Sequence, residues 1–129
     1  MAKKRAFISF DAGHDDDLRV MVAAQAELPD TPFDFADRSA KELPTGDWKE
    51  KVKNRLKNVD LMIVICGEYT DSANGVSAEL SIAKELGLPY FLLEGRSDKT
   101  CVKPKSASAL EKMYSWTWDN LKLLIAGDR

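Results

Sequence analysis

The sequence predicts an α/β protein whose sheet is parallel and carries helices on both faces. Along its 129 residues, short apolar runs alternate with longer stretches in which apolar side chains recur at helical spacing. Strands that alternate with helices through short connections form parallel sheets. Five such units fit this length, and they favour the strand order 2-1-3-4-5 of a flavodoxin-like, three-layer sandwich.

The five expected strands are short and apolar, and one of them is apolar throughout, as a central parallel strand would be. They span residues 6–10, 33–36, 61–66, 88–93 and 114–117. Periodicity predicts helices over 15–28 and 48–59, a third that follows Gly75 and ends at Gly87, a short one over 107–112, and a last one that Asp119 caps.

Composition and net charge argue against a membrane protein and against a nucleic-acid-binding protein. We expect a single domain over residues 1–129, because this length suits one core and no boundary is visible. We expect a cytoplasmic protein with no membrane partner, because there is no signal peptide or spanning run, and Cys66 ends an apolar run like a reduced core thiol. The net charge of −2, with lysines and arginines scattered among acids, argues against nucleic-acid binding.

Two functions common to this architecture conflict with the residues. A flavin phosphate would be repelled by the carboxylates of the loop 11–17 that follows the first strand. A phospho-receiver domain needs a carboxylate where the third strand ends, and residues 65–67 supply none. The acids at 15–17 are therefore better explained as helix caps than as a metal site, and no metal is expected. His14, the only histidine, is expected to be solvated rather than to act as a base.

Glu79 breaks the binary pattern of the third helix. At about 100° per residue its side chain falls within the apolar stripe of that helix. The stripe comprises Val76, Leu80, Ala83 and Leu86. A buried carboxylate is costly unless something compensates, and such positions tend to be functional. Two interpretations stay open at this point: a chemical role, or a helix-dipole contact or buried hydrogen bond to a loop.

Taken together, these residues resemble a TIR domain, in particular the short TIR-like family of stand-alone prokaryotic proteins. The resemblance runs from about Arg5 to Ile125 and rests on the order and spacing of several pieces. They are residues 7–11, 37–38, 46–48, 60–65, 68–72, 77–80 and 83–87, with Trp116 and Trp118 typical of the TIR-like subgroup.

The resemblance implies an activity and a site. Enzymatic TIR domains cleave the nicotinamide–ribose bond of NAD, and some cyclise the ADP-ribose product. Similar proteins of the Thoeris antiphage system make a cyclic ADP-ribose-type messenger for a separate effector. Their catalytic glutamate lies where Glu79 stands here. NAD would be the substrate, and no other cofactor is expected. From topology, the substrate-binding residues are expected to be Phe10, Asp11, Ala12, Gly13, Ser39 and Thr70, with Phe10 stacking on a ring.

The resemblance also implies TIR-type self-association. This chain departs from the family pattern at Asn74 and Gly75, where many TIR domains carry a tryptophan. Its loop between the second strand and second helix is also compact, and such loops mediate TIR assembly. A non-enzymatic interaction module therefore remains the alternative to an NAD-cleaving enzyme.

Overall fold

The computed structural model describes residues 3–38, 48–108 and 110–127. Its sheet has five parallel strands in the order β2-β1-β3-β4-β5, which confirms the predicted fold class. The strands are β1 (Lys4–Ser9), β2 (Phe33–Arg38), β3 (Leu61–Cys66), β4 (Tyr90–Glu94) and β5 (Met113–Ser115). The helices are α1 (Asp16–Ala26), α2 (Trp48–Leu56), the 3₁₀ turn η1 (Thr70–Ser72), α3 (Asn74–Leu86) and α4 (Trp118–Ala126).

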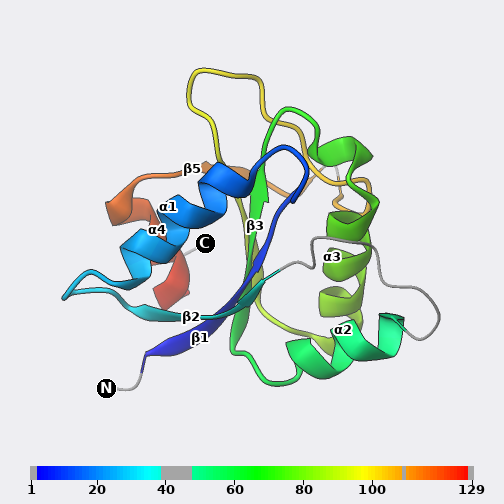
Figure 1. The fold of residues 1–129 in the computed structure, drawn as a ribbon, viewed down its shortest axis with the longest axis horizontal. Helices are drawn as coiled ribbons and strands as arrows, with labels where there is room; N and C mark the ends of the chain where they lie inside the picture. The colour runs from blue at the N-terminus through cyan, green and yellow to red at the C-terminus, as the bar shows by residue number, and fades with distance from the viewer. Residues whose placement is uncertain (1–2, 39–47, 109, 128–129) are drawn as a thin grey trace.

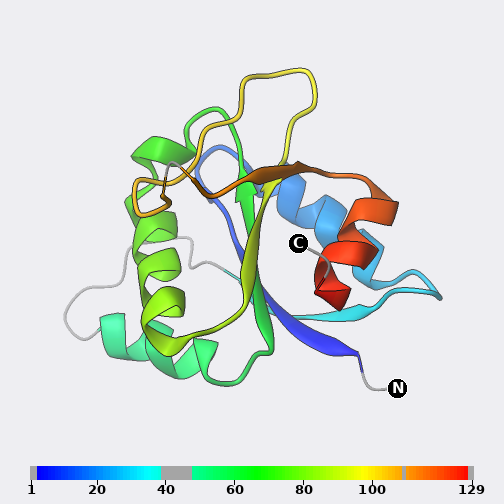
Figure 2. The ribbon, with the colours of Figure 1, turned by 180° about the vertical axis from the view of Figure 1, so that it is seen from behind.

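The helices divide between the two faces of the sheet. α1 and α4 lie on one face, and α2 and α3 lie on the other (Figures 1 and 2). Each face has its own apolar cluster, and the residues at the end of β1 alternate between them. Ile8 and Phe10 pack on the α1/α4 side, whereas Phe7 packs on the α2/α3 side. Side chains of a strand alternate in this way, so Ser9 points toward α3.

Helix α1 differs from its predicted form at both ends. Asp15 stands at the N-cap position, but its side chain makes no capping hydrogen bond. The predicted cap is therefore wrong for Asp15, whose carboxylate pairs with Arg96 instead. The helix also ends at Ala26, two residues before the predicted bound, and Leu28 beyond it is 41% exposed.

The C-terminal segment holds two further corrections. The described part of 107–112 is not helical. The Lys103 ammonium binds the backbone carbonyls of Ser108 and Glu111, and these bonds hold the segment as a loop. Helix α4 is capped by Thr117, whose Oγ1 accepts from the Asn120 N–H, rather than by Asp119. No helix in the described ranges is long and apolar enough to cross a membrane.

Candidate functional site

The carboxyl ends of β1, β3 and β4 meet at one edge of the sheet. Because β1 and β3 are neighbours while β2 lies beyond β1, the chain reverses its direction of winding between β1 and β3. Open parallel sheets bind ligands outside the strand ends at such a point. The loops that follow the three strands carry most of the residues that bear chemistry in this chain.

Glu79 lies at this edge, on the inner side of α3. The residue is only 4% exposed, which confirms the orientation inferred from the helical stripe. Ser9, the last residue of β1, is fully buried, and its Oγ donates a hydrogen bond of 2.8 Å to Glu79 Oε1. The bond joins positions 70 residues apart and fixes one carboxylate oxygen against the end of the strand.

Thr70 is also buried, and its hydroxyl is hydrogen-bonded to a backbone N–H group. Its Oγ1 accepts a 2.7 Å hydrogen bond from the Gly67 N–H, which closes the turn after β3. This contact explains why a polar side chain tolerates full burial here. A substrate contact through Thr70 requires that turn to rearrange.

The loop after β1 contains the other predicted binding residues. Asp11 organises this loop: its carboxylate accepts from the Gly13 N–H at 3.1 Å and lies 2.7 Å from His14 Nδ1. Ala12 is partly buried and packs beside the α1/α4 core. The structure thus groups Asp11, Ala12 and Gly13 in one turn. The expectation for Ser39 lies outside the described residues.

Phe10 lies in the core rather than in a crevice. It is 3% exposed and packs in the α1/α4 cluster, on the sheet face opposite Glu79. The expected stacking on a substrate ring would therefore require Phe10 to leave this core. The reason is the alternation of the backbone after β1, which turns Phe10 away from the face that Ser9 occupies.

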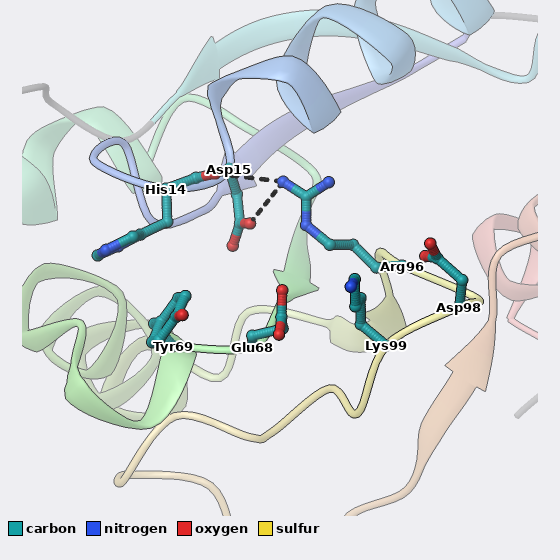
Figure 3. A pocket seen from close by; sticks show the side chains of 7 residues that line it. All are labelled: His14, Asp15, Glu68, Tyr69, Arg96, Asp98 and Lys99. Atoms are coloured by element: carbon teal, nitrogen blue, oxygen red, sulfur yellow. Dashed lines mark hydrogen bonds and ion pairs between the residues drawn. The ribbon is translucent and has the colours of Figure 1, made fainter.

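A cavity of about 170 Å³ lies at the same edge, and sequence reasoning did not find it (Figure 3). Its walls come from the loops after β1, β3 and β4. They are His14, Asp15, Glu68, Tyr69, Arg96, Asp98 and Lys99. Glu79 is not among these side chains. The loop after β4 has no periodicity, so nothing in the local pattern distinguishes Arg96 from other polar loop residues.

Arg96 joins the loops after β4 and β1. Its guanidinium donates to both carboxylate oxygens of Asp17, at 2.8 and 3.1 Å, and to Asp15 Oδ1 at 3.1 Å. It also donates to the His14 carbonyl. Arg96 therefore ties the residues at the start of α1 to the loop after β4.

The pKa values of Asp15 and Asp17, which both pair with Arg96, shift in opposite directions. The hydrogen bond from Arg96 lowers the pKa of the exposed Asp17 carboxyl. Burial raises the pKa of Asp15 above its usual value, although the Arg96 guanidinium opposes that shift. The desolvation of Asp15 thus outweighs its ion pair.

The part of the chain that builds this edge of the sheet matches a known protein family. The family model described as the Thoeris protein ThsB, TIR-like domain, matches residues 7–100. The chain belongs to this TIR-like family. No curated protein matches the chain significantly. The ThsB TIR-like match includes Ser9, Glu79 and every residue that lines the cavity, but not β5 or α4. Membership associates the chain with Thoeris antiphage defence.

No group of three or more His, Cys, Asp or Glu side chains in the described ranges is placed to hold a metal ion. Cys66 is a buried free thiol, as predicted, and burial raises its pKa to about 12. A thiol with that pKa stays protonated at neutral pH and is a poor nucleophile. Cys66 is therefore not a candidate nucleophile in the folded protein.

Proposed function

We propose that this chain cleaves the nicotinamide–ribose bond of NAD in antiphage defence, as an NAD glycohydrolase or as an ADP-ribosyl cyclase that makes a cyclic messenger. The observation that carries the proposal is the Glu79 carboxylate, 4% exposed on an apolar helix stripe and hydrogen-bonded by Ser9 at the strand-end edge. Membership of the ThsB TIR-like family supports the choice of substrate.

The reaction suits one carboxylate. The C1′–N bond of NAD breaks with its electron pair going to the pyridinium nitrogen, so nicotinamide leaves as a neutral molecule. The general acid that protonates the leaving group of an ordinary glycoside is therefore unnecessary. Positive charge develops on the ribosyl carbon and ring oxygen, and a fixed negative charge beside them lowers the barrier. Glu79 supplies that charge in this proposal.

The second half of the reaction decides the product. Attack by water on the ribosyl cation gives ADP-ribose and releases a proton. Attack by a nucleophilic atom of the adenosine half gives a cyclic product without water, which an effector could recognise. Asp11, Ala12 and Gly13 form the turn that we propose to contact the substrate, with Thr70 and Ser39 as further predicted contacts.

The test is nicotinamide release from NAD by the purified protein and in lysate from phage-challenged cells. Glu79→Gln should lower the turnover rate by at least about 100-fold, because the transition state loses its countercharge. Glu85→Gln makes the same change on the same helix at a side chain that is 50% exposed, and it should leave turnover unchanged. Mass spectrometry of the products separates hydrolysis from cyclisation.

Two results would contradict the proposal. Equal nicotinamide release by wild type and Glu79→Gln would remove Glu79 from the chemistry. No release by the wild type in either setting, together with concentration-dependent self-association, would favour the non-enzymatic interaction module.

A further inference from the structure

The cavity after β1, β3 and β4 is distinct from the Glu79 carboxylate and has features of a binding site of its own. Asp15 forms part of its wall and is 1% exposed. Its Oδ1 atom accepts from Arg96, but its Oδ2 atom is buried and has no hydrogen-bond partner. Buried carboxylate oxygens are nearly always satisfied, so an orphan at a cavity wall indicates a missing donor.

The position of Asp15 is built into the backbone. A Cβ atom at Gly67 would collide with both carboxylate oxygens of Asp15, so glycine is required for the carboxylate to rest on the end of β3. Arg96 also holds Asp15 in place, because its Nη2 atom donates to Asp15 Oδ1. The same guanidinium binds both carboxylate oxygens of Asp17. Figure 3 shows the Asp15 carboxylate projecting toward Glu68 and Tyr69, with Arg96 beside it.

The opposite wall is aromatic. The ring of Tyr69 stacks near that of His14, with centroids 4.5 Å apart. Tyr69 is 50% exposed, so part of its ring faces the solvent beside the cavity. Glu68 beside it is exposed as well. A donor that reaches the buried Oδ2 atom of Asp15 from the cavity must therefore approach past these side chains.

The charges of the cavity select among ligand classes. Asp15, Glu68 and Asp98 outnumber Arg96 and Lys99, and Arg96 is already engaged by two carboxylates, so an anion is disfavoured. A metal ion lacks a third ligand among the described residues. A charged N–H donor satisfies a carboxylate best, and a cation also gains from an aromatic face.

We propose that this cavity binds a compact, planar organic cation with N–H donors, of the amidinium or guanidinium kind, through the free oxygen of Asp15 and the ring of Tyr69. The size agrees, because a cavity of about 150 Å³ holds a benzene ring. The site is independent of NAD cleavage and would exist in a protein without turnover.

The test is a titration of the ¹⁵N-labelled protein with benzamidine, followed by amide chemical shifts and by calorimetry. Benzamidine should bind saturably and shift the Gly67 and Tyr69 amides. Benzamide has the same shape without the charge and should bind at least 10-fold more weakly. Benzoate should not bind.

Substitutions at Asp15 and Tyr69 test whether these two side chains contact benzamidine. Asp15→Asn should weaken benzamidine binding at least 10-fold, whereas the same change at Asp119, which is 91% exposed, should have no effect. Tyr69→Ala leaves the Asp15–Arg96 pair intact and should weaken binding several-fold, so it decides the matter if Asp15→Asn fails to fold. The proposal is overturned by absent saturation at millimolar benzamidine, by equal affinity for benzamide, or by unchanged binding to Tyr69→Ala.

Discussion

Glu79 and Asp15 are both buried carboxylates at the same edge of the sheet, but their partners differ. Glu79 accepts a hydrogen bond from the neutral hydroxyl of Ser9, whereas Asp15 pairs with the guanidinium of Arg96. A hydroxyl hydrogen bond orients a carboxylate oxygen without adding a positive charge of its own. The Arg96 guanidinium offsets part of the charge of Asp15 and connects the loop after β4 to the loop after β1. The contrast separates a carboxylate suited to chemistry from one suited to structure and ligand binding.

Removal of the Ser9 hydroxyl tests the first half of this contrast and should have the larger effect. If Glu79 acts in NAD cleavage, Ser9→Ala should lower kcat by about 10- to 150-fold with little change in KM, because a hydrogen bond to a charged group contributes about 1.5–3 kcal/mol. Steady-state kinetics with NAD measure both constants.

The matched variant is Ser9→Cys, which preserves side-chain volume but donates weakly. A positioning role for Ser9 predicts that Ser9→Cys loses kcat as well. Wild-type kcat in Ser9→Cys would show that Ser9 matters only for packing.

Removal of Arg96 tests the second half. Arg96→Ala should lower the free energy of unfolding by about 1–3 kcal/mol at pH 7, because the buried Asp15 carboxylate then lacks a countercharge. Urea unfolding measures the loss. Arg19→Ala breaks an ion pair with the exposed Asp16 and should cost only about 0.2–1 kcal/mol.

The pKa shifts of Asp15 and Asp17 determine how the stability lost in Arg96→Ala depends on pH. Burial raises the pKa of Asp15, so its ionisation disfavours the folded state as pH rises above the unfolded value near 3.8. Arg96 opposes this cost and lowers the pKa of Asp17, which adds stability that is lost in acid. The deficit of Arg96→Ala should therefore shrink as pH falls from 7 toward 4. A deficit that is constant over this range would contradict the electrostatic role.

The smallest effect concerns Cys66, the last residue of β3, whose thiol is close enough to Asp15 to feel its charge. Because burial raises its pKa to about 12, iodoacetamide at pH 8 should modify the half-buried Cys101 and leave Cys66 intact until the chain unfolds. Mass spectrometry of peptides counts the sites. Labelling of Cys66 should be faster in Arg96→Ala than in Arg19→Ala, because Arg96 holds this edge closed. Equal labelling of both thiols in the native wild type would disprove the burial of Cys66.

Patterns within a single element predicted much of this molecule. The alternation of apolar runs with helical stretches predicted the fold class, and the angular position of Glu79 predicted its inward orientation, because both patterns reflect the local periodicity of strand or helix. Gly87 ends α3 in the left-handed conformation with φ of 68°, as expected of a glycine at that position. A role in NAD chemistry, by contrast, rests on family resemblance and stays a prediction.

What the sequence alone determined is therefore the fold and the face on which Glu79 lies. Tertiary structure alone decided that Asp15 gives up its capping role and that Arg96 reaches it from 81 positions away. The physical reason is that periodicity assigns a side chain to a face within its own element. Which loops meet at the end of a parallel sheet depends instead on strand order and register, and no local pattern records the partners that meet there.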